Sequence, residues 1–187
     1  NEKLTIAKLL IDELKIDRIE GASARVSEGE LNSVKQITSW AKQNKKIESI
    51  EVLTFLDDGR SIKWLLDSGC TVQNLLTKGS INHLTYQLKK TPSNHFKDIL
   101  KTIQRAEESS IQTNIYLEDW SNGMKNSKSY VMDMLQFLTE KKIDRILLPD
   151  TLGVLTPDLT KEFIKYITSN FPEIHFDFHA HNDYDLS

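Results

Sequence analysis

The sequence predicts an α/β fold of the TIM (β/α)8 barrel type, with about six βα units present in 187 residues. Short runs rich in β-branched and aromatic residues alternate with helical patterns, and successive βα units build a parallel sheet. Polar residues gather where several of these runs end, which is where barrel active sites lie. The predicted strands are residues 16–23, 49–56, 71–79, 113–119, 143–151 and 174–181.

The segments between these strands carry helix signals. Ser27, three residues before Glu30, forms a capping-box pattern, and Thr156 followed by Pro157 is typical of a helix start. We also expect Ser61 to cap a helix that Gly69 ends. Apolar residues recur at helical spacing in the other segments. The predicted helices are residues 4–14, 31–44, 62–68, 93–109, 127–142 and 158–170.

The strand patterns favour a barrel over an open sheet. Strands of an open parallel sheet are covered on both faces and are apolar throughout. Here the faces differ: in the last strand His179 and His181 share one face, while Phe176 and Phe178 share the other. The polar lumen of a barrel explains the face that carries the two histidines. An open Rossmann-like sheet is the alternative, although its glycine-rich phosphate turn is absent from the sequence.

Composition excludes several classes of function. The formal net charge is −3 and basic residues are scattered, so we expect no nucleic-acid partner. No apolar run reaches transmembrane length, so we expect no membrane partner. Cys70 is the only cysteine, which excludes an internal disulfide and indicates a reducing, cytoplasmic location. We expect Cys70 to fill space at a strand edge, and a reactive thiol is the lesser alternative.

His179 and His181 are candidate metal ligands. Residues i and i+2 of a strand project the same way, so both imidazoles can reach one ion, such as Zn, Mn, Fe or Co. The simpler alternative is a pair of histidines that hydrogen-bond within a polar lumen. Glu118 ends its strand and is a candidate proton acceptor, with a salt bridge at the barrel rim as the alternative.

Three further residues follow strands. Asp150 is expected to cap the loop after its strand, and Thr151 can donate a hydrogen bond to a substrate carboxylate. His83 is a substrate-binding candidate, against the simpler interpretation of an exposed loop histidine. The strand residues that face the lumen would by default pack the barrel; these include Leu53, Leu76 and Tyr116.

Together the motifs resemble the DRE-TIM metallolyases, the acyl-CoA-using barrels that include isopropylmalate, citramalate and homocitrate synthases and HMG-CoA lyase. The resemblance covers essentially the whole chain. It rests on five stretches, which are RIEGASARVSEGEL, LLTKGSINHLTYQLKKT, IYLEDWSNGM, LPDTLGVLTP and the HxHND pattern near the end. Each motif is weak alone, and the set is specific.

The resemblance implies a reaction. Acetyl-CoA loses a methyl proton, its enolate attacks the keto carbon of a 2-oxo acid, and thioester hydrolysis releases CoA and a hydroxy diacid. His179 and His181 match the family's ligands for a divalent ion (Mn, Mg, Zn or Co). Glu118 matches the glutamate that assists proton removal, and Thr151 matches the threonine that holds the substrate carboxylate.

The local match favours the (R)-citramalate synthase and 2-isopropylmalate synthase group of isoleucine and leucine biosynthesis. In that group, residues matching Leu53, Leu76 and Tyr116 form a tight apolar pocket that suits pyruvate. The alternatives are a 2-isopropylmalate synthase that uses 2-oxoisovalerate and, from another class, a non-catalytic barrel scaffold. HMG-CoA lyase is disfavoured, because it normally has HxHDT where this chain has HAHND. Family members are usually homodimers.

Two family features are absent from the sequence. The Asp ligand of strand one, with its neighbouring Arg, is missing, and so is the GxGERAG segment near strand eight. Residues 1–187 are therefore expected to be a partial barrel domain, truncated at both ends and holding strands two to seven of eight. Such a domain would supply half a metal site.

Overall fold

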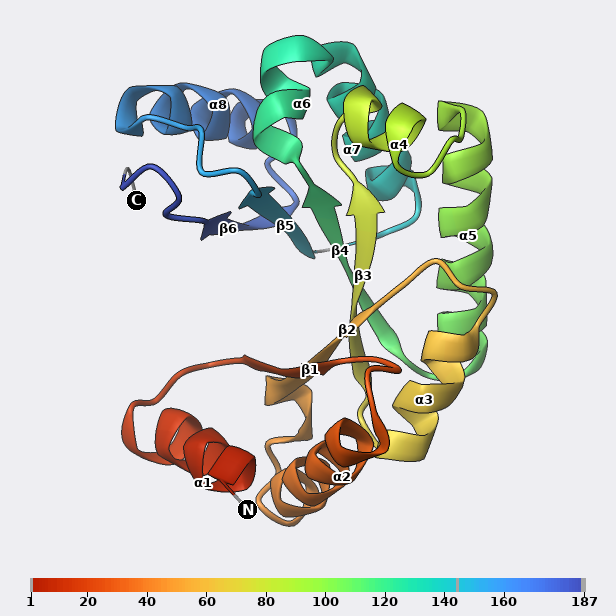
Figure 1. Cartoon of the computed structure of the whole chain (residues 1–187), viewed down its shortest axis with the longest axis vertical. Coiled ribbons are helices and arrows are strands. Elements are labelled where there is room, and N and C mark those ends of the chain that lie inside the picture. Colours follow the sequence, from red (N-terminus) through yellow and green to blue (C-terminus); the bar gives the residue numbers. More distant parts are fainter. Residues whose placement is uncertain (1, 144, 186–187) are drawn as a thin grey trace. The chain divides into compact units, whose positions relative to one another are not determined.

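Six parallel strands and the helices between them make up the fold (Figure 1). The computed structural model describes residues 2–143 and 145–185. The sheet order follows the chain, β1-β2-β3-β4-β5-β6, which confirms the predicted alternation. The strands are β1 (Ile19–Ser23), β2 (Ile50–Thr54), β3 (Val72–Lys78), β4 (Gln112–Glu118), β5 (Arg145–Asp150) and β6 (His175–Ala180).

The helices precede β1 or connect successive strands. They are α1 (Glu2–Lys8), α2 (Glu28–Gln43), α3 (Arg60–Ser68), α4 (Ile81–Tyr86), α5 (Pro92–Glu108), α6 (Trp120–Asn126), α7 (Lys128–Glu140) and α8 (Pro157–Asn170). A π-helical turn, η1 (Leu9–Glu13), continues α1, and a 3-10 turn, η2 (Ile47–Ser49), precedes β2. None of the helices in the described ranges is both long and apolar enough to cross a membrane.

The chain forms two compact units. Unit 1 comprises Asn1–Leu75 and Lys101–Thr113, and unit 2 comprises Leu76–Leu100 and Asn114–Ser187. The strands β3 and β4 and the helix α5 contribute residues to both. Most of the predicted site residues belong to unit 2.

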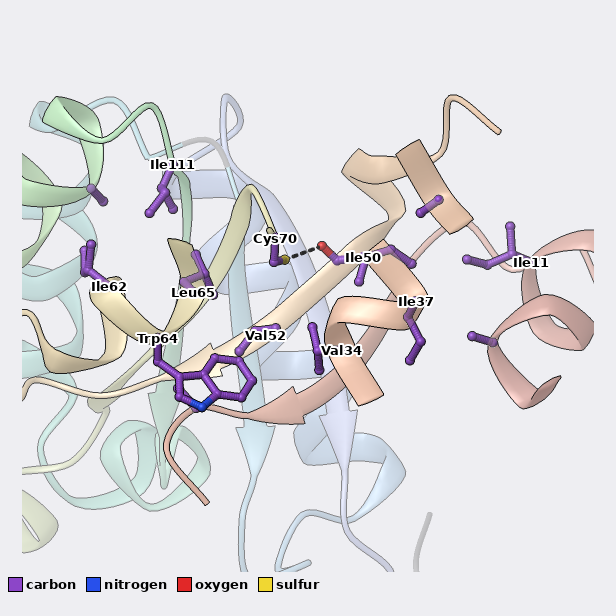
Figure 2. Packing of buried hydrophobic residues seen from close by; sticks show 14 residues of the cluster. Ile11, Val34, Ile37, Ile50, Val52, Ile62, Trp64, Leu65, Cys70 and Ile111 are labelled. Atoms are coloured by element: carbon purple, nitrogen blue, oxygen red, sulfur yellow. Dashed lines mark hydrogen bonds between the residues drawn. The ribbon is translucent and has the colours of Figure 1, made fainter. Parts of the chain in front are cut away.

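The core of unit 1 fills the space between the sheet and its helices. Residues of α2, such as Val34 and Ile37, are buried together with Ile50 and Val52 of β2 (Figure 2). Cys70 lies in this core, and its thiol donates a hydrogen bond to the Ile50 carbonyl at 3.0 Å. Burial raises the pKa of this thiol to about 11, so it stays protonated. Cys70 is therefore a core residue, as predicted.

Two helix starts are confirmed and one prediction is wrong. The Ser27 hydroxyl accepts from the Glu30 N–H at 3.1 Å, and the Thr156 hydroxyl accepts from the Leu159 N–H at 3.3 Å. Ser61, however, lies inside α3, which begins at Arg60. The carboxylate of Asp57 accepts from the Ser61 N–H at 3.0 Å and from its hydroxyl at 2.7 Å. A carboxylate outside the helix thus replaces the expected serine cap.

Two short helices, α4 and α6, were not predicted. They contain six and seven residues, which is too short for an apolar periodicity to show. Ser80 caps α4, because its hydroxyl accepts from the His83 N–H at 3.1 Å. The other predicted helices are present within a few residues of their expected ends.

The polar face of the sheet is present in both units. In unit 1, the Asn74 amide donates to the carboxylates of Glu20 and Glu51 at 2.8 and 2.9 Å. In unit 2, Ile115 and Leu117 of β4 are fully buried. Between them lies Tyr116, whose side chain contacts a histidine of β6. The alternation of faces that favoured a barrel is therefore real.

Candidate active site

The carboxyl ends of β3, β4, β5 and β6 carry most of the predicted site residues. In unit 2 the ends of β3 and β4 lead into α4 and α6, which lie at the same end of the strands (Figure 1). Strands β5 and β6 pair in parallel register, so Pro149 lies opposite His179 and Asp150 opposite Ala180. Parallel pairing thus brings the ends of these strands to one edge.

The rings of His179 and His181 lie on the same side of β6. They stack with their centroids 4.9 Å apart and their planes 27° apart, and both residues are exposed. The Tyr116 hydroxyl lies 3.3 Å from Nδ1 of His179. Both imidazoles can therefore be reached from solvent and from one position, as the i, i+2 spacing predicts.

The surroundings of His179 favour its neutral form. Although His179 is exposed, nearby protein atoms partly desolvate its ring and lower the pKa of this imidazole, and the neighbouring His181 lowers it further by charge repulsion. A neutral imidazole has a lone pair to offer, so this is the form that binds a metal ion. Within residues 2–143 and 145–185, no three His, Cys, Asp or Glu side chains are grouped so as to hold a metal. His179 and His181 are thus two candidate ligands, and metal binding by them stays a prediction.

Glu118 ends β4 among charged neighbours. Its carboxylate forms an ion pair with the Lys78 ammonium. Nδ1 of His83 lies 3.8 Å from the same carboxylate. The glutamate is only 21% exposed, which distinguishes this ion pair from a solvated rim contact. The carboxylate is paired, as the salt-bridge alternative expects. It is also partly enclosed, which suits the alternative of a proton acceptor.

Thr151 is oriented by a backbone hydrogen bond. Its hydroxyl oxygen accepts from the Asp119 N–H at 2.8 Å. A hydroxyl has one hydrogen to donate and oxygen lone pairs to accept with, so this contact leaves the hydrogen available. Among the described residues, the structure shows no acceptor for it. The arrangement suits donation to a carboxylate.

Asp119 is a site residue that the sequence reasoning missed. It is fully buried and adopts a left-handed backbone conformation with φ 63°. Its carboxylate accepts from the Ser80 hydroxyl at 2.6 Å and from the Asn122 amide at 2.7 Å. It thereby joins the starts of α4 and α6 beside Glu118. Aspartate tolerates the left-handed region better than most residues, which is the one local signal available.

Two glycines permit this junction. The Gly79 N–H donates to the Glu118 carbonyl at 2.6 Å. A Cβ on Gly123 would lie 2.0 Å from the Gly79 carbonyl oxygen, so only glycine fits inside α6 at this point. The loops after β3 and β4 are therefore packed backbone against backbone.

The whole chain matches a known family. The profile described as HMGL-like matches residues 1–187. The chain belongs to the HMGL-like family. One sequence relative is the (R)-citramalate synthase CimA of Methanocaldococcus jannaschii. It is 31% identical to this chain, and the match covers 100% of this chain and 36% of the relative. A homocitrate synthase of Sulfolobus acidocaldarius is 26% identical over 98% of this chain and 38% of its own length. A probable 2-isopropylmalate synthase of Ignicoccus hospitalis is 27% identical over 100% of this chain and 44% of its own length.

Solved structures support the same fold for this HMGL-like chain. One is an HMG-CoA lyase from Acinetobacter baumannii in complex with coenzyme A and 3-methylmalate. The match covers 98% of this chain and 61% of the lyase chain, with a TM-score of 0.73 and 19% sequence identity. Another is the hydroxymethylglutaryl-CoA lyase of Pseudomonas aeruginosa. The match covers 98% of this chain and 63% of the lyase chain, with a TM-score of 0.68 and 17% sequence identity. The predicted TIM-barrel fold class is confirmed. The chain spans less than half the length of the sequence relatives named above.

Two predictions about individual residues of the HMGL-like chain now have outcomes. His83 is not an exposed loop residue, because it lies in α4 and is buried. Its Nε2 lies 3.5 Å from the Asp119 carboxylate, and its buried Nδ1 has no hydrogen-bond partner among the described residues. Asp150 does cap its loop, accepting from the Leu155 N–H at 2.8 Å.

The three residues predicted to form an apolar pocket do not all belong to one unit. Leu53 belongs to unit 1, whereas Leu76 and Tyr116 belong to unit 2. All three are partly exposed. Their shared contact with a substrate stays a prediction. A cavity of about 650 Å³ in unit 2 is lined by other residues, including Ser80, Asn82 and Asn122.

Proposed function

We propose that the full-length protein condenses acetyl-CoA with a small 2-oxo acid, and that pyruvate is preferred, which gives citramalate. It would act as an acyltransferase of isoleucine and leucine biosynthesis. The observation that carries this proposal is one edge of unit 2, where Glu118, Thr151 and the His179–His181 pair end neighbouring strands. The names of three relatives, which are citramalate, homocitrate and 2-isopropylmalate synthases, support the same reaction class.

Each residue has a role that its surroundings permit. Glu118, enclosed and paired, would take the methyl proton of acetyl-CoA as the enolate forms. The resulting carbanion carbon bonds to the keto carbon, and hydrolysis of the thioester releases CoA. Thr151, with its hydroxyl hydrogen available, would hold the carboxylate of the 2-oxo acid in place.

We propose that His179 and His181 hold a divalent ion. Their shared side of β6, their exposure and the lowered pKa of His179 support two nitrogen ligands. When bound, such an ion supplies Lewis-acid polarisation of a carbonyl oxygen. The chain's own contribution is to present two imidazoles at the edge where Thr151 follows β5.

The choice of pyruvate rests on the apolar side chains. We propose that Leu53, Leu76 and Tyr116 close around the methyl group of the 2-oxo acid. A difference of one or a few methylenes changes selectivity by about 1–3 kcal/mol. A 2-isopropylmalate synthase that uses 2-oxoisovalerate is the second candidate, favoured by the relative from Ignicoccus hospitalis.

The test is the release of CoA from acetyl-CoA by the full-length protein. We expect kcat/KM for pyruvate to exceed that for 2-oxoisovalerate by roughly tenfold or more, in line with one or two methylenes. Glu118→Gln should abolish release with either acid. A preference for 2-oxoisovalerate would select the second candidate, and no release with any 2-oxo acid would select a non-catalytic scaffold.

We also propose a cytoplasmic homodimer. The lone cysteine is buried, which suits a reducing compartment. The substrates, acetyl-CoA and a small 2-oxo acid, are the partners that this proposal requires.

A further inference from the structure

Lys78 is the immediate neighbour of Glu118 in unit 2. It is the last residue of β3, and its ammonium forms an ion pair with the Glu118 carboxylate. The side chain of Lys78 is only 11% exposed, and that of Glu118 is 21% exposed. At this burial the pair is shielded from water, so each charge depends on the other for solvation.

The backbone of Lys78 is held by two buried side chains. Its N–H donates to Nε2 of His95 at 3.2 Å, and its carbonyl accepts from the Tyr130 hydroxyl at 2.8 Å. Burial, followed by the charge of Lys90, lowers the pKa of His95 to about 4, which keeps Nε2 free to accept. Burial also raises the pKa of Tyr130, which keeps its hydroxyl protonated and able to donate. Lys78 is thus fixed on both sides of its Cα.

The Lys78 side chain is held at its far end as well. The ammonium donates to Oε1 of Gln87 at 2.8 Å, in addition to Glu118. A lysine on a flexible stem normally loses rotamer entropy when it forms one contact. Here the contact with Gln87 already restricts the side chain, and the fixed backbone sets where the side chain starts. The ammonium is therefore a pre-organised partner for the glutamate.

We propose that Lys78 is a positioning residue that holds the Glu118 carboxylate in one orientation for proton removal. This inference rests on the proposed function, because it requires Glu118 to act on acetyl-CoA. The lysine would act through the glutamate and would make no contact with the substrate. A carboxylate displaced by an ångström from a reacting proton loses about a hundredfold in rate.

The experiment compares Lys78→Met with the wild-type full-length protein in CoA release. We expect kcat to fall on the order of 100-fold while KM for the 2-oxo acid changes little. Lys63→Met is the matched control, because it removes a surface ion pair with Asp67 (3.1 Å) and has no part in holding Lys78. That control should retain wild-type kcat.

A rescue experiment separates positioning from folding. Alkylation of the variant Lys78→Cys with 2-bromoethylamine restores an ammonium on a side chain of lysine length. The protein's own Cys70 is buried, and its thiol has a pKa raised to about 11, so it should not react. We expect kcat of the alkylated variant to recover at least tenfold over the unmodified one, with one alkylation more, by mass, than the wild-type protein treated in parallel.

The outcomes are distinguishable. No CoA release by the wild-type protein with any 2-oxo acid would overturn the proposed function and this inference with it. An active wild type beside a fully active Lys78→Met would overturn the inference alone. So would a raised KM with unchanged kcat, since that would place the ammonium on the substrate. Failure of the alkylated variant to recover, with its alkylation confirmed, would also overturn it.

Discussion

The Thr151 hydroxyl can accept a hydrogen bond from the backbone and donate one to a ligand at the same time. Its oxygen accepts from the Asp119 N–H, and its hydrogen is left to donate. Asp119 in turn ties two short helices to the strand that carries Glu118. A single residue outside the sequence prediction thereby fixes the direction in which Thr151 can act.

We expect Thr151→Val to lower kcat/KM for the 2-oxo acid by roughly 10- to 100-fold, because a hydrogen bond to a charged group is worth about 1.5–3 kcal/mol. Thr151→Ser keeps both functions of the hydroxyl and should stay near wild type. The measurement is CoA release at varied 2-oxo acid concentration. Thr156→Val, which removes the cap of α8, is the control for lost stability. Equal losses in Thr151→Val and Thr156→Val would argue against a substrate contact.

At the scale of elements, a buried histidine joins the start of α5 to the end of β3. His95 is fully buried, and its Nε2 accepts from the Lys78 N–H. Burial and the charge of Lys90 lower its pKa from 6.5 to about 4. The folded protein therefore resists protonation of this ring in a pH range where the unfolded chain accepts a proton.

The free energy of unfolding should depend on pH through His95. The contribution of His95 to the free energy of unfolding is fully present above pH 6.5. It falls by an amount on the order of 3 kcal/mol as the pH drops from 6.5 towards 4. Urea unfolding between pH 7.5 and 5 measures it in a range where the carboxylates stay ionised. His95→Gln removes this titrating group and should reduce the slope, leaving the smaller part that comes from the lowered pKa of His179. If the wild-type slope persists in that variant, another group is responsible.

For the whole molecule, the residues proposed for the reaction are distributed over the two units. Leu53 comes from unit 1, whereas Glu118, Thr151 and the two histidines come from unit 2. The chain covers about a third to under a half of its relatives' length, so the two histidines are proposed as part of a larger ligand set.

We expect the full-length protein to retain about one divalent ion per chain after gel filtration, measured by elemental analysis, and to lose CoA release after chelation. His181→Ala should weaken the affinity for the metal tenfold or more, and the variant should therefore retain less metal. His175→Ala is the matched control, since His175 is an exposed histidine of the same strand that pairs with Asp177 at 2.7 Å. Equal metal content in the two variants would exclude His181 as a ligand.

The sequence by itself determined the strands and the longer helices of this protein. Strand and helix patterns depend on neighbours a few residues apart, so the six strands, the Ser27 and Thr156 caps and the shared side of His179 and His181 could be predicted. The Ser61 cap failed because a carboxylate outside the predicted helix, that of Asp57, took its place.

Only the tertiary structure decided how the candidate site is built. Lys78 and Glu118 are 40 residues apart, and Ser80 and Asp119 are 39 apart, so no local pattern links them. The burial of His83 depends on a short helix without a detectable period. These contacts form because parallel strands bring distant carboxyl ends to one edge, where packing selects which charges meet.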